Sequence, residues 1–216
     1  MRERMEFSHM QNVILTRAVE RSLAERRAAT ESEIRRLVDA AFAVMRRADG
    51  VDPRVSDIVR EAGLSNQAFY RHFRSKDELL VAVMEEGRQR LLSSLERRMA
   101  DAPDPVGAVR AWIEGVMAQA EHPRAAEATR PFAVDAARLA HRFPEETAAS
   151  AAALQAPLAA ALAAAGSPDP ARDAEAVYHL AVGRMERHLV VGTRPSAADV
   201  GHLVDVALHG VLRTGH

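Results

Sequence analysis

The sequence contains no cysteine, so the chain can form neither a disulfide framework nor a thiolate metal site. Aromatic residues are scarce as well: they make up 4% of the 216 residues, against 48% hydrophobic and 27% charged residues. This balance is typical of a soluble globular protein rich in Ala, Leu and Val. Because proteins without cysteine fit a reducing compartment, we expect a cytoplasmic protein.

Neither a secretion signal nor a membrane anchor is predicted. Residues 1–6 carry charges of both signs and lead into no apolar segment of signal-peptide type. The one long uncharged run, 147–166, is mostly alanine and contains Gln155 and Pro157, which makes it too weakly apolar for a membrane span. The net charge of −1 predicts no general attraction to nucleic acid, so any such binding must come from a local patch.

Motifs of the common enzyme classes are also missing. The sequence has no G-x-S-x-G, H-E-x-x-H, P-loop or dinucleotide-binding pattern. Nine histidines invite a metal-sensor hypothesis, but His179 and His188 fall on opposite faces of one helix, and no pair has convincing ligand spacing. We predict no catalytic site, no metal site and no cofactor. A small α-helical ligand carrier or enzyme without DNA binding stays open as the alternative.

Alternating strand patterns are lacking, and helical periodicity runs along most of the chain. A capping box at 30–33 predicts that the first secure helix begins there and ends near Gly50. Asp52 and Pro53 supply the start of a short second helix, which Gly63 closes.

A third and a fourth helix follow closely. Ser65 can cap the third, and Ser75 opens a fourth that runs to about Met99. Two short helices that meet at a tight glycine turn suggest a helix-turn-helix. The sequence therefore predicts an all-α fold in three parts: an N-terminal extension, 1–28, that is an extra helix or disordered; a three-helix helix-turn-helix domain, 29–76; and a larger helical domain, 77–216.

The predicted third helix has an aromatic flank and a polar flank. Phe69 and Phe73 are suited to packing inward, whereas the polar flank consists of Asn66, Gln67, Tyr70 and Arg71. Asn and Gln can make paired hydrogen bonds to adenine in the major groove, and each good pair discriminates by about 1–3 kcal/mol. We interpret this flank as DNA-binding; the alternative interpretation is an ordinary solvated surface with a half-buried tyrosine.

Lysine is the rarest cation: Lys76 is the only one, although Lys and Arg together number 29. It stands directly after Ser75, in a first helical turn where the helix dipole disfavours positive charge. Tyr70, His72 and Lys76 could hold DNA phosphates, which fixes position more than sequence. His72 could instead satisfy a core carbonyl group, and the single lysine could be an accident of coding in an arginine-rich chain.

Residues 55–80, VSDIVREAGLSNQAFYRHFRSKDELL, resemble the helix-turn-helix signature of the TetR/AcrR family of bacterial transcriptional regulators. The resemblance covers roughly 34–80 and implies a homodimer on a palindromic double-stranded DNA operator. It also implies a C-terminal domain that holds a small-molecule effector of unknown identity and the dimer interface. By the family's pattern, the DNA contacts fall on Ser65, Asn66, Gln67, Tyr70, His72 and Lys76.

Two positions depart from that pattern. Many members have a small residue where this chain has Gln67, so a base contact there would be particular to this protein. Arg54 replaces a frequent threonine at the start of the second helix, where an arginine could reach a phosphate. The resemblance implies a repressor that a ligand relieves, although activation or corepression would leave the same sequence pattern.

Aromatic, methionine and histidine residues of the larger domain are the candidates for an effector pocket. They are Trp112, Met117, Phe132, His141, Phe143, Tyr178, Met185 and His188. On a helix, such residues belong to the hydrophobic core at least as often as they line a ligand pocket. Apolar stripes over 174–185 and 200–212 could form a dimeric four-helix bundle, or could pack within one chain.

Overall fold

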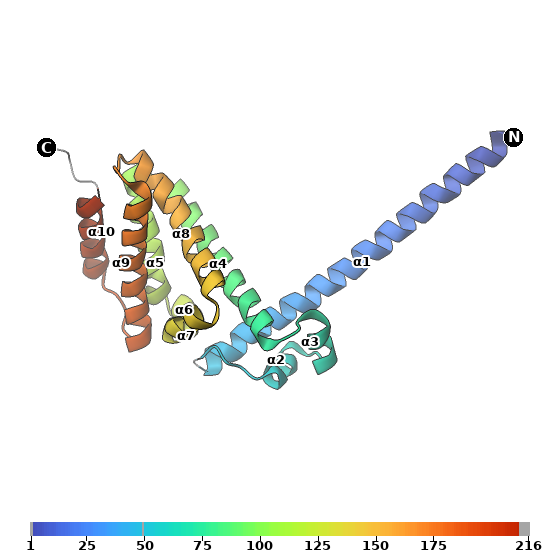
Figure 1. The fold of residues 1–216 in the computed structure, drawn as a ribbon, viewed down its shortest axis with the longest axis horizontal. Helices are drawn as coiled ribbons and strands as arrows, with labels where there is room; N and C mark the ends of the chain where they lie inside the picture. The colour runs from blue at the N-terminus through green and yellow to red at the C-terminus, as the bar shows by residue number, and fades with distance from the viewer. Residues whose placement is uncertain (1, 49, 212–216) are drawn as a thin grey trace.

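The computed structural model describes residues 2–48 and 50–211, with the backbone alone for 2–16 and for 18. These ranges contain ten α-helices and no strand, which confirms the predicted all-α fold (Figure 1). In chain order they are α1 (Arg2–Ala48), α2 (Val55–Ala62), α3 (Asn66–His72), α4 (Lys76–Ala100), α5 (Pro105–Glu121), α6 (Pro123–Val134), α7 (Ala136–Arg142), α8 (Pro144–Ala164), α9 (Pro170–Val191) and α10 (Ala197–Val211).

Helix α1 is longer than the sequence pattern suggested, and its N-terminal half extends away from the rest of the chain (Figure 1). The prediction that a helix begins at Thr30 is wrong, because the helix runs unbroken from Arg2. A capping residue needs a non-helical backbone, and no glycine or proline before Gly50 interrupts the helix. The expected boundary between 1–28 and 29–76 therefore falls inside one element.

The turn between α2 and α3 has the predicted glycine stop. Gly63 adopts φ 62° and ψ 38°, a left-handed conformation that ends α2. Arg36 of α1 donates to the carbonyl oxygens of Ala62 and Gly63 at 2.5 and 3.1 Å. Ser65 Oγ then accepts a hydrogen bond from the backbone N–H of Ala68 at 3.1 Å. The end of α2 and the start of α3 are thus both fixed by specific hydrogen bonds.

Helix α2 begins at Val55, and the prediction that Asp52 and Pro53 start it is wrong. Asp52 does not cap α2 because its carboxylate accepts a hydrogen bond from Lys76 instead. Ser75, in contrast, caps α4 as predicted. The helix-turn-helix is therefore present, with a second helix shorter than expected.

Buried apolar side chains form two cores. The N-terminal core joins α1, α2, α3 and the first turns of α4, and the C-terminal core joins the rest of α4 to α5, α8, α9 and α10. Leu139 of α7 and Phe143, the residue that follows α7, belong to the N-terminal core. The two parts of the chain are therefore packed together across α7, and the expected boundary between 76 and 77 is no break in the packing.

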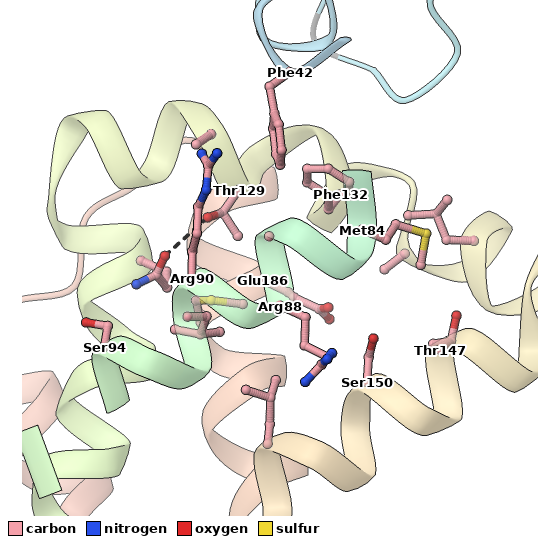
Figure 2. A pocket seen from close by; sticks show the side chains of 18 of the residues that line it. Phe42, Met84, Arg88, Arg90, Ser94, Thr129, Phe132, Thr147, Ser150 and Glu186 are labelled. Carbon is pink, nitrogen blue, oxygen red and sulfur yellow. Dashed lines mark hydrogen bonds between the residues drawn. The ribbon is translucent and has the colours of Figure 1, made fainter. Parts of the chain in front are cut away.

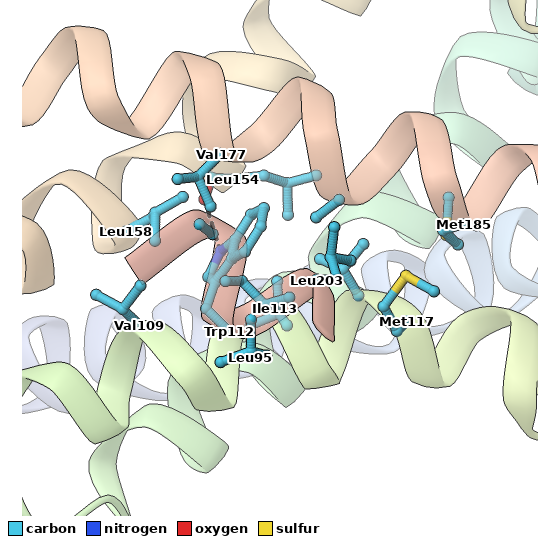
Figure 3. Close-up of a cluster of buried hydrophobic side chains, with 14 of the residues drawn as sticks. Leu95, Val109, Trp112, Ile113, Met117, Leu154, Leu158, Val177, Met185 and Leu203 are labelled. Atoms are coloured by element: carbon cyan, nitrogen blue, oxygen red, sulfur yellow. Dashed lines mark hydrogen bonds between the residues drawn. The ribbon is translucent and has the colours of Figure 1, made fainter. Parts of the chain in front are cut away.

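Trp112 of α5 lies at the centre of the C-terminal core (Figure 3). Its side chain is fully buried, and its Nε1–H donates to the carbonyl oxygen of Leu154 at 3.1 Å. Helices α4 and α5 approach closely at Gly115, where a Cβ atom would stand 2.5 Å from Leu95 Cδ2. The apolar stripes of α9 and α10 also pack into this core, so they serve the folding of the single chain.

Among the described residues, α8 is the one helix long and apolar enough by composition to cross a membrane, with a mean hydropathy of 1.4. One such helix is weak evidence for a membrane span. Its composition is dominated by alanine, and the helix packs against α5 and α9. The apolar face of α8 thus has protein partners.

Candidate DNA-binding surface and effector pocket

Helix α3 presents a polar face to solvent. Asn66, Gln67, Tyr70 and Arg71 are exposed, while Phe69 between them is buried. Tyr70 is 61% exposed, and its ring meets the edge of the Phe69 ring with centroids 5.1 Å apart. The predicted division of α3 into a polar flank and a packing flank is confirmed. The four exposed side chains form one accessible surface, which we call the reading face.

Two other predicted contact residues stand at helix starts. Ser65 is the N-cap of α3, and Arg54 occupies the N-cap position of α2 without a side-chain capping bond. Both residues are exposed. The N-terminus of a helix attracts phosphate through its free N–H groups, and arginine is a strong phosphate ligand. Both positions are therefore accessible to a nucleic-acid backbone.

Glu33 of α1 holds the C-terminal end of α3. Its Oε2 lies 2.6 Å from His72 Nε2 and 3.3 Å from Arg71 Nη1. The hydrogen bond from His72 is the main reason that the pKa of Glu33 lies below its ordinary value. The His72 side chain is only 6% exposed, so it is turned inward towards α1. His72 orients α3 in this structure, and Arg71 shares its partner while staying exposed.

Lys76 has an acidic partner within the protein. Its Nζ lies 2.5 Å from Oδ1 of Asp52, the residue that precedes Pro53. This hydrogen bond is the largest cause of the lowered pKa of Asp52, and the charges of Arg138 and Arg142 lower it further. The cation in the first turn of α4 is thus offset by a carboxylate from the preceding loop. A DNA phosphate at Lys76 would compete with Asp52.

A pocket of about 470 Å³ lies where α1 meets the C-terminal helices (Figure 2). Its wall comes from α1 and from α4 to α9, and it is mostly apolar. The larger apolar side chains in it are Phe42, Met84, Leu91, Phe132, Leu139, Leu154 and Met185. Size and lining are typical of a site for a small organic molecule.

The pocket contacts the N-terminal part of the chain through Phe42 of α1. The Phe42 ring meets the Phe132 ring edge-on with centroids 5.9 Å apart, and the Arg90 guanidinium lies 5.3 Å from the Phe42 centroid. Arg90 also pairs with Asp39 of α1 and with Glu86. A side chain of α1 is therefore part of the pocket wall itself.

Two of the eight side chains predicted for an effector site, Phe132 and Met185, line this pocket. Trp112 and Met117 are fully buried in the C-terminal core, and Phe143 is buried in the N-terminal core. All three side chains are packed inside a core, and close packing leaves no space beside them for a ligand.

The remaining three candidates also lie elsewhere. Tyr178 packs beside Trp112 with ring centroids 6.4 Å apart, and His141 is exposed on α7. His188 Nδ1 lies 2.9 Å from Thr193 Oγ1 near the end of α9. None of the three belongs to the pocket wall described above.

Several polar wall residues had no signal in the sequence. The ionisable ones are Arg46, Arg88, Arg90 and Glu186, and Thr129, Thr147 and Ser150 contribute hydroxyl groups. Each looks like an ordinary polar position of an amphipathic helix until the helices are assembled. In the ranges that the structure describes, no three acidic, histidine or cysteine side chains are grouped so that they could hold a metal ion.

Comparison with known proteins agrees with this arrangement. Residues 37–83 match the model of bacterial regulatory proteins of the tetR family. The fold is similar to that of a transcriptional regulator from Rhodococcus sp. Rha1, with a TM-score of 0.67 and 22% identity over 83% of this chain and 96% of that one. No curated protein matches the chain in sequence.

Two other solved structures share the fold. A TetR-family transcriptional regulator from Agrobacterium tumefaciens has a TM-score of 0.62 and 22% identity, over 84% of this chain and 98% of that one. Reduced NemR from E. coli has a TM-score of 0.67 and 14% identity, over 85% of this chain and all of its own, 100%. The likeness extends beyond the helix-turn-helix to both parts of the chain.

Proposed function

Because the chain belongs, through its N-terminal domain, to the TetR family of bacterial regulatory proteins, we propose that it is a ligand-relieved repressor that binds a palindromic operator. That it is a DNA-binding transcriptional regulator is supported by the family match itself. The exposed reading face of α3, held by Glu33 and the Ser65 cap, is the observation that carries the proposal. Such a helix fits the major groove, where its N-terminal residues meet base edges.

The contacts of the DNA-binding part divide into two kinds. Asn66 and Gln67, in the first turn of α3, are placed to read bases, because amide side chains pair with adenine. Arg54, Ser65, Tyr70 and Arg71 are exposed and suited to phosphates, which position the protein on the duplex. His72 contributes by orienting α3 through Glu33, and a direct phosphate contact would require that bond to break.

A homodimer is the second part of the proposal, since a palindromic operator needs two reading faces. The outward faces of α9 and α10 are the candidate interface. They carry apolar side chains that the chain's own core does not cover, namely Leu180 at 42%, Val190 at 48% and Val206 at 49% exposure. Gly183 of α9 has open space around it, which would let a second copy approach closely. A soluble cytoplasmic protein fits this role.

Relief by a ligand follows from the position of the pocket. Phe42 connects its wall to α1, and Arg142 of α7 pairs with Asp77 in the first turn of α4. The backbone N–H of Val51 also donates to Asp135 Oδ2 at 3.1 Å. A ligand that shifts α6 or α7 would therefore move the reading face, and a coupling of about 1–3 kcal/mol would change operator affinity about 5- to 150-fold.

Genomic footprinting of bound sites, followed by fluorescence anisotropy on the recovered sequence, tests the proposal. We expect a palindromic site bound at least about 1,000-fold more tightly than unrelated DNA at physiological salt. Weak binding that is indifferent to sequence would favour the alternative, a helical ligand carrier or enzyme without DNA binding.

Lys76→Ala is expected to weaken binding to all DNA sequences alike and to lower the salt slope by about one per domain, because one phosphate contact is lost. Asp52→Asn is the matched variant: it frees Lys76 and should tighten DNA binding. Stability should change by no more than about 1 kcal/mol in either variant, since the pair is partly exposed. An unchanged salt slope in both variants would leave Lys76 as the partner of Asp52 alone.

Gln67→Ala is expected to reduce discrimination at one operator base pair by about 1–3 kcal/mol, with little change in affinity for unrelated DNA. Anisotropy titrations against operators substituted at each position measure this. Arg60→Ala, an exposed change on α2 whose side chain pairs with Asp57, is the control and should leave the base preference intact. A uniform loss over all operators would place Gln67 among the phosphate contacts.

A further inference from the structure

In the described ranges, Glu186 is the one acidic side chain in the pocket wall, and it lacks a partner. Glu186 of α9 is half-buried and makes no hydrogen bond or ion pair with any residue that the structure describes. Its surroundings in the pocket include Met185 and Leu154. Burial raises the pKa of the Glu186 carboxyl above its ordinary value. A carboxylate that has lost water without gaining a partner is costly, and such groups are usually paired in proteins.

The cations of the wall do not neutralise Glu186. Arg88 donates through Nε and Nη2 to the two carboxylate oxygens of Glu85, so its charge is already matched. Arg90 is paired with Glu86 and with Asp39 of α1. Figure 2 shows the Arg88 and Glu186 side chains reaching into the same space, yet no ion pair joins them. Arg46, the third cation of the wall, is exposed, and no ion pair joins it to Glu186, so the Glu186 carboxyl has no cationic partner among the described residues.

Two hydroxyl groups on α8 add acceptors to the same pocket wall. Thr147 and Ser150 are three residues apart, which places them on one face of the helix, and Figure 2 shows them on the side of the pocket. The Thr147 hydroxyl is buried and has no hydrogen-bond partner among the described residues. A hydroxyl oxygen and a carboxylate both accept hydrogen bonds from an ammonium group.

We propose that the effector is a lipophilic primary amine whose ammonium group pairs with Glu186 while its apolar body fills the apolar part of the pocket, against Phe132 and Met84. The inference rests on the proposed function only in calling the pocket an effector site. An ammonium ion satisfies the orphaned carboxylate and offers three donors, two of which the α8 hydroxyl groups can accept. An anionic ligand would add a second negative charge beside Glu186, which is unfavourable in an apolar pocket.

Three probes of one shape test this: 4-phenylbutylamine, 4-phenylbutan-1-ol and 4-phenylbutanoate, titrated by calorimetry into the full-length protein at neutral pH. The amine is expected to bind about 10- to 100-fold more tightly than the alcohol, because hydrogen bonds to charged groups are the stronger ones. The carboxylate should bind more weakly than the alcohol. Binding of the amine should also raise the melting temperature with concentration.

Glu186→Gln should reduce the preference for the amine over the alcohol to within about 3-fold. The variant should fold, because it removes a charge that burial disfavours. The raised pKa of Glu186 means that the folded protein loses stability as the pH rises through that pKa. The amide of the variant does not ionise, so its stability has no such pH dependence. Glu175→Gln, an exposed position on the same helix, is the matched control and should keep the preference.

Equal binding of the amine and alcohol, or a preference for the carboxylate, would overturn the inference; Arg88 would then be the anchor. A preference that survives Glu186→Gln would overturn it as well. Operator binding is measured separately. If the protein binds an operator but not the amine, this inference alone is wrong. If it binds the amine but no specific DNA sequence, the proposed function alone is wrong.

Discussion

Replacing Trp112 with alanine is expected to lower the free energy of unfolding by about 3–5 kcal/mol. Trp112 is fully buried in the C-terminal core, among side chains that include Leu95, Ile113 and Val177 (Figure 3). Its removal would leave a large cavity and would also remove the hydrogen bond from Nε1 to the Leu154 carbonyl oxygen. Since domains are stable by only about 5–15 kcal/mol, this is a large share of the total.

Urea unfolding followed by far-UV circular dichroism measures this effect, because the variant lacks the only tryptophan of the chain. Trp112→Phe is the matched control. It keeps most of the apolar volume, and we expect it to cost about half as much or less. A loss below about 1 kcal/mol for Trp112→Ala would mean that the residue borders open space, as the sequence allowed when it made Trp112 an effector-pocket candidate.

The reading face of α3 could be predicted from the sequence because its determinants are local. Gly63 ends one helix, Ser65 and Ser75 cap the next two, and the alternation of Phe69 and Tyr70 separates the inner from the outer flank. Each of these effects acts within a few residues along the chain. Tertiary packing preserves the helix boundaries and the exposed flank that these local signals define.

Local signals failed where they competed with stronger neighbours. The capping box at Thr30 lies in a segment of good helix formers with no glycine or proline, so propagation of α1 overrides it. Asp52 would be a good cap for α2, but the Lys76 ammonium offers its carboxylate a stronger, charge-assisted bond. Neither outcome follows from residues adjacent in sequence alone.

The pocket could be predicted only in part, because its wall is assembled from seven helices. Phe42 and Met84 lie on the inward stripes of α1 and α4, which periodicity assigns to a core. Glu186 has the spacing of a surface residue, and only the assembled helices leave it half-buried without a partner. Aromatic residues are scarce and methionine is adaptable, and these properties made both kinds of side chain pocket candidates although they mostly fill cores.

Phe69→Ala is expected to abolish specific DNA binding through the fold of the N-terminal core, with a loss of about 3–5 kcal/mol in its stability. Phe69 is fully buried, and its ring packs against that of Phe73 with centroids 5.8 Å apart. It is the largest side chain of α3 in the N-terminal core, where α3 packs with α1 and α2. Without it, Asn66 and Gln67 would no longer be held at a fixed depth and angle for the major groove.

Tyr70→Ala is the matched variant, one position along the same helix. Tyr70 is 61% exposed, so its removal should change the free energy of unfolding by no more than about 0.5 kcal/mol while weakening the DNA complex. Unfolding curves and operator titrations on the two variants therefore distinguish a residue that stabilises the domain from a residue that contacts DNA. If Phe69→Ala lost operator binding with its unfolding curve unchanged, Phe69 would itself be a contact residue, and the inward assignment of this flank of α3 would be wrong.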